Sequence, residues 1–147
     1  FLPVAHAGEE GPPEYIRQAI DDLKIVRIDH GNRCVEDAQL MSKIKGKEMA
    51  LTMCPLSNTE LQVIDDLKEH PLKLLMDQEL KVTVNSDDPA YFGGYINENY
   101  KAIQEALSLN KDDIYTLAYN SIEYSFLQNE RKNLLLTEVD DFYKENS

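Results

Sequence analysis

The chain is 147 residues long and carries 27 acidic against 15 basic side chains, a formal net charge of −12 at pH 7. Nucleic-acid backbones and anionic membranes repel such a chain, so we expect neither as a partner. Its apolar runs are far shorter than a membrane span, and the sequence contains no glycine-rich loop of the P-loop kind. A chain of this length can bury one core, so residues 1–147 are expected to form a single domain.

Apolar runs and amphipathic stretches alternate along the chain, which predicts alternating strands and helices. In the first amphipathic stretch, Ile16, Ala19, Ile20 and Leu23 recur at the spacing of one helix face. Strands are predicted at residues 2–5, 24–28, 49–54 and 81–85. Helices are predicted at residues 16–23, 35–44, 71–80, 96–107, 114–122 and 137–143, with Asp112 or Asp113 as the N-cap of the fifth.

Four strands that alternate with helices predict a parallel sheet built from right-handed βαβ units. An open doubly wound sheet and part of a (β/α)₈ barrel both satisfy this pattern. Polar clusters follow consecutive strands, as a barrel requires, and no GxGxxG sequence follows any strand. A complete barrel needs about 250 residues and eight strands. The sequence therefore predicts an α/β fold that is half of a TIM barrel, about four βα units plus C-terminal helices.

Three polar clusters stand where predicted strands end, and each contains residues that can bind metal or move protons. They are His6 with Glu9, His30 after an apolar run, and the adjacent pair Asp87 and Asp88. Alone, each has an ordinary structural explanation, such as a helix N-cap for an aspartate. Two like charges one residue apart cost free energy unless a cation neutralises them. Their common position at one edge of a parallel sheet therefore predicts a single active site with a metal ion.

Cys34 and Cys54 are the only cysteines, and their wide spacing favours reduced, buried residues over a zinc-thiolate site. Reduced thiols favour the cytoplasm, with the nucleus as a further compartment in a eukaryote. The chain opens at Phe1 with an apolar stretch and no initiator Met. We therefore expect a fragment whose N-terminal part is missing.

Four motifs in order carry a family resemblance: HAGE at 6–9, RIDHG at 27–31, CPLSN at 54–58 and VTVNSDDPAYFGGY at 82–95. The chain resembles the zinc-dependent adenosine/adenine deaminase family. SDDPAYFGGY, together with RIDHG where adenosine deaminases more often have RIGHG, is most similar to the adenine deaminase branch. The resemblance implies the C-terminal half of a (β/α)₈ barrel that hydrolyses adenine, a small-molecule purine, to hypoxanthine and ammonia.

The same resemblance implies a role for each site residue. His6 and Asp87 resemble ligands of the one Zn²⁺, and Glu9 resembles the acid that protonates purine N1. His30 resembles the histidine beside the attacking water, and Asp88 resembles the acceptor that binds purine N7. Burial is expected to raise the pKa of Glu9, and His30 is expected to be neutral.

The family's His-x-His pair of zinc ligands does not occur in this sequence. Two further ligands are therefore expected from the missing N-terminal part, and the chain by itself is expected to bind zinc weakly and to be inactive. Two other functions stay open: the same chemistry on adenosine, and a non-catalytic relic that serves as an interaction module. The sequence does not indicate the oligomeric state.

Several further residues near the motifs have two interpretations. Aromatic side chains after the paired aspartates could wall a purine pocket or pack the loop onto the barrel; they are Tyr91, Phe92 and Tyr95. Ser57 and Asn58 are interpreted as turn residues in preference to substrate contacts. His70, directly before Pro71, is interpreted as a surface or capping residue.

Overall fold

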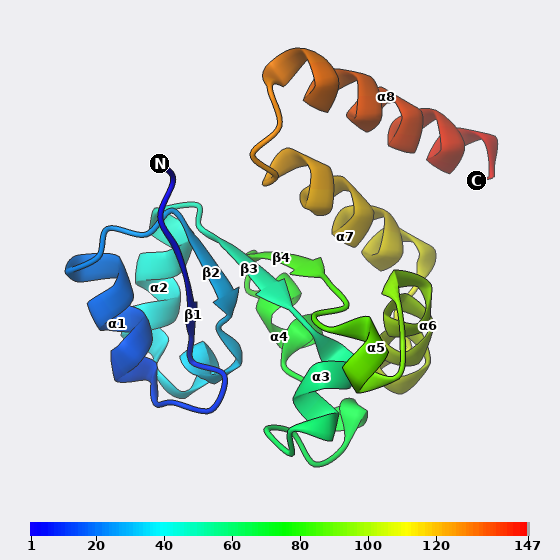
Figure 1. Cartoon of the computed structure of the whole chain (residues 1–147). Helices are drawn as coiled ribbons and strands as arrows, with labels where there is room; N and C mark the ends of the chain where they lie inside the picture. Colours follow the sequence, from blue (N-terminus) through cyan, green and yellow to red (C-terminus); the bar gives the residue numbers. More distant parts are fainter. Residues whose placement is uncertain (147) are drawn as a thin grey trace.

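The computed structural model describes residues 1–146, and its strands form one parallel sheet in the order β1-β2-β3-β4 (Figure 1). The strand bounds are Val4–Ala7 (β1), Arg27–His30 (β2), Ala50–Met53 (β3) and Lys81–Val84 (β4). Each strand pairs with the next one in sequence, as in a barrel wall, whereas a doubly wound sheet reverses its order at a switch point. All four predicted strands are present: β1 and β2 lie two to three residues further along the chain than predicted, and β3 and β4 lie within their predicted ranges.

The two faces of the sheet differ in chemistry because side chains alternate along each strand. Ile28, Leu51 and Val82 are paired in register across β2, β3 and β4, and all three are fully buried. One residue further along, His6 pairs with Asp29, and Asp29 pairs with Thr52. Thr52 Oγ1 donates to Asp29 Oδ1 at 2.9 Å, so this second row forms a connected polar face.

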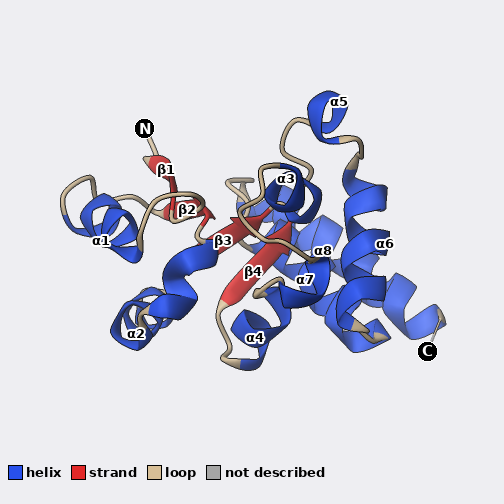
Figure 2. Cartoon of the chain, turned by 90° about the horizontal axis from the view of Figure 1, so that it is seen from below, coloured by secondary structure: helices blue, strands red, loops and turns tan. Residues whose placement is uncertain are grey.

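Helices follow each strand and cover the apolar face. Figure 2 shows α1, α2 and α4 along one side of the row of strands. The bounds are Pro13–Asp21 (α1), Ala38–Gly46 (α2), Pro55–Glu60 (α3), Leu72–Asp77 (α4), Pro89–Phe92 (α5), Ile96–Leu107 (α6), Lys111–Glu123 (α7) and Asn129–Glu145 (α8). Short 3₁₀ helices span Asn32–Glu36 (η1) and Leu67–Glu69 (η2).

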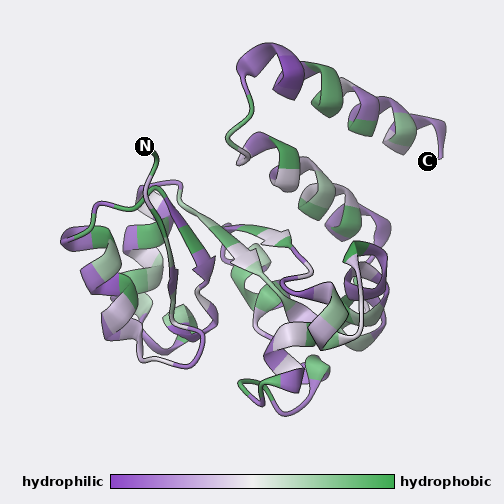
Figure 3. Cartoon of the chain, viewed as in Figure 1, coloured by the Kyte–Doolittle hydropathy of each residue, from purple (hydrophilic) through white to green (hydrophobic). Residues whose placement is uncertain are grey.

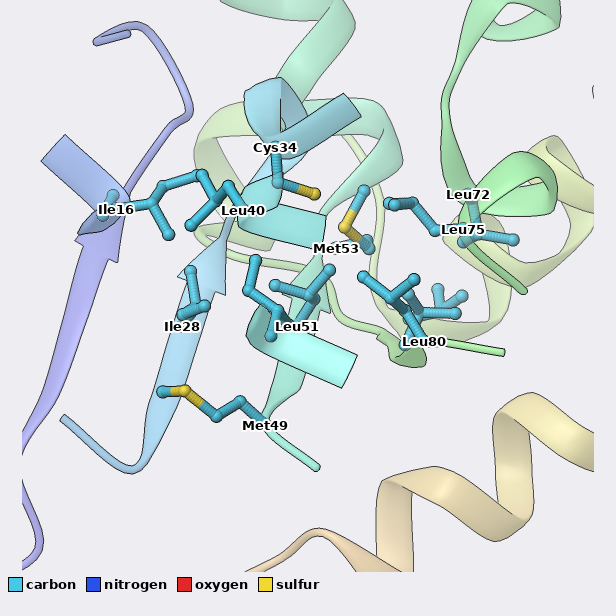
Figure 4. Close-up of a cluster of buried hydrophobic side chains, with 14 of the residues drawn as sticks. Ile16, Ile28, Cys34, Leu40, Met49, Leu51, Met53, Leu72, Leu75 and Leu80 are labelled. Atoms are coloured by element: carbon cyan, nitrogen blue, oxygen red, sulfur yellow. The ribbon is translucent and has the colours of Figure 1, made fainter. Parts of the chain in front are cut away.

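The core lies between these helices and the sheet. Figure 4 shows Leu40 of α2, Leu51 of β3, and Leu72 and Leu75 of α4 in one cluster, and all four are fully buried. Burying each such side chain stabilises the fold by roughly 1.5–3 kcal/mol. This packing holds the carboxyl ends of the strands in fixed positions relative to one another.

Three predictions about helix ends are corrected by local hydrogen bonding. α1 ends at Asp21, so Leu23 lies beyond the helix and is exposed. The helix predicted to begin at residue 35 begins at Ala38, because the Asp37 side chain accepts from Leu40 N–H and caps it. Asn110 caps α7, and neither of the two predicted aspartates does: its Oδ1 accepts from Asp113 N–H.

The C-terminal helix α8 stands away from the sheet and lies against α7 (Figure 1). It is longer than the predicted segment 137–143, and none of its described residues is buried. Its two faces mix polar and apolar residues (Figure 3). An apolar cleft of about 470 Å³ lies between the two helices. Among residues 1–146, no helix combines the length and apolar character needed to cross a membrane.

Candidate active site

A tight turn after β1 places His6 and Glu9 at the carboxyl edge of the sheet. Gly8 has φ +68°, and a Cβ there would lie 2.3 Å from Cδ1 of the buried Ile16, so only glycine fits. His6 lies inside β1, on the polar face, and its side chain is 70% exposed. Glu9 points back over the strand ends, with its carboxyl group partly buried.

His30 is the last residue of β2, and its imidazole ring lies among the other site residues. It has φ +66° and is followed by Gly31 at φ +80°, a strained geometry that proteins hold mainly at functional sites. Its Nε2 lies 3.9 Å from Asp87 Oδ2, and the His6 and His30 ring centroids are 5.0 Å apart. Its Nδ1 lies 3.2 Å from Glu9 Oε1, outside hydrogen-bond alignment, and is buried without a hydrogen-bond partner among the described residues.

Asp87 follows β4 and also has a left-handed backbone, with φ +55°. Ser57 Oγ donates to its Oδ2 at 2.8 Å, which fixes the carboxylate toward His30. Asp88 is exposed at the start of α5, and its side chain makes no cap hydrogen bond. The structure therefore brings Glu9, His30 and Asp87 into contact, with His6 beside His30, and leaves Asp88 at the rim.

The interpretation of Ser57 and Asn58 as turn residues is wrong. Both belong to α3, and both are fully buried. Asn58 Nδ2 donates to Glu9 Oε1 at 3.0 Å, so both residues hold carboxylates of the site. Their position directly after β3 is the signal that could have identified them, because the other site residues were selected by the same rule.

His70 is buried, at 3% exposure, so its interpretation as a surface residue is wrong. The capping interpretation agrees with its geometry, since Nδ1 accepts from Leu72 N–H at the start of α4. Its Nε2 lies 3.3 Å from Asn58 Oδ1, a contact between distant segments that no local pattern could reveal.

The aromatic residues after the aspartates divide between two environments. Phe92 is buried and packs edge-on against Tyr91, with ring centroids 4.9 Å apart. Tyr91 and Tyr95 are largely exposed. Of the two interpretations, loop packing therefore describes Phe92, and the role of the two tyrosines stays a prediction.

The electrostatics of the site favour a protonated acid beside a neutral histidine. Burial, followed by the charge of Asp87, raises the pKa of Glu9, while the hydrogen bond from Asn58 opposes that rise. Burial, followed by the nearby His6, lowers the pKa of His30. Both directions are those predicted from the sequence. Glu9 can therefore donate a proton, and His30 can accept one.

The donor set fits a divalent cation. Imidazole and carboxylate groups are ordinary Zn²⁺ ligands, and the charge of Asp87 that raises the pKa of Glu9 would be neutralised by a cation. Among the described residues, His30, Cys54 and Asp87 have ligand atoms within 4.8 Å of one another, and His6 is outside this group. Cys54 is buried, as predicted, and burial raises the pKa of its thiol to about 12, so it is protonated at neutral pH.

The sequence profile described as "Adenosine deaminase" matches residues 1–142. The chain is 56% identical over 139 residues to an adenine deaminase of Sphingopyxis alaskensis, covering 95% of this chain and 41% of that protein. It is 58% identical over 142 residues to an adenine deaminase of Hahella chejuensis, covering 97% and 42%. The chain thus spans about two fifths of the length of these curated relatives.

Solved structures agree with the sequence relatives. The crystal structure of adenine deaminase from Arthrobacter aurescens superposes with a TM-score of 0.94 at 47% identity, over 96% of this chain and 43% of that one. An N6-methyl-AMP deaminase from Arabidopsis thaliana gives a TM-score of 0.80 at 26% identity, over 94% and 40%. The fold predicted from the sequence, part of a (β/α)₈ barrel, is confirmed.

Proposed function

The chain belongs to the adenosine deaminase family, and we propose that the protein containing it hydrolyses adenine to hypoxanthine and ammonia with one zinc ion. The observation that carries this proposal is the convergence of Glu9, His30 and Asp87 from three separate strand ends. Identity of 56–58% to two adenine deaminases supports adenine as the substrate.

In this proposal His6 and Asp87 supply two of the zinc ligands, and the remaining two come from a segment outside this chain. Bound zinc would supply a nucleophilic water near neutral pH. The catalytic residues of this chain do the rest. His30 accepts a proton from the attacking water, because its lowered pKa keeps the ring neutral. The ring lies between two carboxyl groups: its Nδ1 is next to Glu9 and its Nε2 is next to Asp87.

Glu9 donates a proton to purine N1 as the water oxygen bonds to C6. Burial raises its pKa, which favours the protonated form that can donate as the ring nitrogen gains electron density. His30 then returns its proton to the departing amino group, and the C6 hydroxyl proton passes to Glu9, so that ammonia leaves and hypoxanthine remains. In this proposal Asp88, which is exposed at the rim, binds the N7 side of the purine. Free, buried thiols at Cys34 and Cys54 accord with a reducing compartment, so we place this activity in the cytoplasm.

The full-length protein with bound zinc tests this proposal when adenine and adenosine are supplied separately and hypoxanthine and inosine are measured. We expect adenine to be converted faster. Removal of zinc with a chelator should stop the reaction, and added zinc should restore it. Glu9→Gln should lower kcat by about 100-fold or more, because it removes the proton donor.

The control is Glu10→Gln, which changes the exposed neighbouring carboxylate and should retain the wild-type rate. Faster conversion of adenosine would assign the nucleoside as the substrate instead. A wild-type protein that converts neither purine would contradict the proposal and leave the interaction-module interpretation.

A further inference from the structure

The proton of His70 is fixed on one ring nitrogen by its buried surroundings. Nδ1 accepts a hydrogen bond from the Leu72 backbone N–H at 3.2 Å, and a backbone N–H can only donate. Nδ1 therefore carries no proton. Burial lowers the pKa of His70 to about 4, so the ring is neutral near pH 7 and its single proton is on Nε2.

That proton determines the orientation of the Asn58 amide. Nε2 of His70 lies 3.3 Å from Asn58 Oδ1 and donates to it. The amide nitrogen then faces Glu9 and donates to Oε1 at 3.0 Å. The flipped amide would bring two donors together at His70 and would take the amide donor away from Glu9 Oε1. With Asn58 fully buried, no solvent could satisfy those groups, so the flip is strongly disfavoured.

The orientation of Asn58 in turn distinguishes the two oxygens of Glu9. Oε1 accepts the amide N–H, and the carbonyl oxygen of a carboxyl group is its better acceptor, so this hydrogen bond favours a Glu9 proton on Oε2. Three hydrogen bonds thus run in one direction, from the start of α4 through α3 to the turn after β1. All the donors point toward the site.

We propose that His70 is a positioning residue that acts through Asn58 to keep Oε2 of Glu9 as the oxygen that delivers the proton. This inference rests on the proposed function, because Glu9 matters here as the proton donor. Without the relay, the carboxyl group can rotate or carry its proton on either oxygen, and fewer molecules hold it in the productive geometry.

The test uses substitutions in the full-length, zinc-containing protein. His70→Phe keeps a ring but removes the donor, and Asn58→Leu removes the amide at similar volume. We expect each to lower kcat by about 10- to 100-fold with a smaller change in KM. His70→Gln restores an N–H donor near the position of Nε2 and should recover most of the rate. The double variant should be no slower than Asn58→Leu alone, since His70 acts only through Asn58.

The matched control is Asn120→Leu, which removes another buried amide, one that donates to the backbone carbonyl of Val82 at 3.0 Å. It should lower stability and leave kcat unchanged, which separates positioning from general loss of packing. A wild-type kcat in His70→Phe, or losses that multiply in the double variant, would overturn the relay.

Nitrogen NMR of histidine-labelled protein provides a readout that does not depend on activity. We expect His70 in the neutral form protonated at Nε2, with a signal that moves in Asn58→Leu and stays in Asn120→Leu. A proton on Nδ1, or a His70 signal insensitive to Asn58, would rule the relay out. If these signals appear as expected while wild-type protein converts neither purine, the proposed function fails and the hydrogen-bonded relay stands.

Discussion

Glu9 lies close enough to Asp87 for the charge of one carboxylate to change the protonation of the other. Each carboxylate is stabilised by one side-chain hydrogen bond: Asn58 donates to Glu9, and Ser57 donates to Asp87. These donors do not cancel the effect of burial, so the pKa of Glu9 remains raised. A raised pKa suits Glu9 to its proposed role as proton donor. In the absence of a cation, the ionised form of Glu9 lowers the stability of the fold.

Substitution of Glu9 should therefore change stability in a way that depends on pH. The folded-state pKa is above the unfolded value of 4.5. The stability that Glu9 contributes is fully present below that value and is lost as the pH rises through the folded-state pKa. Glu9→Gln, neutral at every pH, should raise the melting temperature of metal-free full-length protein at pH 7 and have little effect at pH 4.

We would measure the melting temperatures of wild-type protein, Glu9→Gln and Glu10→Gln by thermal unfolding at about pH 4 and about pH 7. The Glu10 variant should change the melting temperature less, because its side chain is exposed and its charge raises the Glu9 pKa less than burial and Asp87 do. An equal shift at both pH values for Glu9→Gln would mean that ionisation of Glu9 carries no folding cost.

At the scale of elements, periodicity and turn residues predicted the strands, five of the helices (α1, α2, α4, α6 and α7), part of α8, and the sheet edge where the site lies; α3 and α5 were not predicted. Those signals are local, and they failed where a distant contact decides the outcome. Ser57, Asn58 and His70 resemble turn or surface residues until α3 folds over the end of β1. The N-cap of α7 was predicted wrongly because Asn110, Asp112 and Asp113 are all suitable caps by residue type.

The Asn110 cap should contribute measurably to the stability of α7. Its Oδ1 accepts from Asp113 N–H at 2.9 Å, and the Asp113 side chain accepts from Asn110 N–H at 3.1 Å. Asn110→Ala should lower the free energy of unfolding by about 1 kcal/mol. Urea denaturation with an unchanged m-value would measure it. Asn97→Ala, at an exposed position in the first turn of α6, is the matched control; equal losses in the two variants would contradict the capping role.

For the whole molecule, the most important feature is the open sheet. Within residues 1–146, β1 and β4 each pair with one strand only, and the polar face around His6 is uncovered. Unpaired parallel edges promote association. The two zinc ligands proposed for this chain, His6 and Asp87, are fewer than the three usual in catalytic centres.

A polypeptide of residues 1–147 alone should therefore aggregate or pair with a second copy, and it should retain little zinc. Light scattering after size-exclusion chromatography measures its mass, and metal analysis after dialysis against dilute chelator measures its zinc. A monodisperse monomer that keeps nearly one zinc per chain would show that the half-barrel is complete as a metal site.

The position of the metal in the full-length protein tests the account most directly. Anomalous X-ray scattering at the zinc edge should show one ion bound by a nitrogen of His6 and a carboxylate oxygen of Asp87, each at about 2.0–2.2 Å. An ion held by His30, Cys54 and Asp87 without His6, or no ion shared by His6 and Asp87, would contradict it.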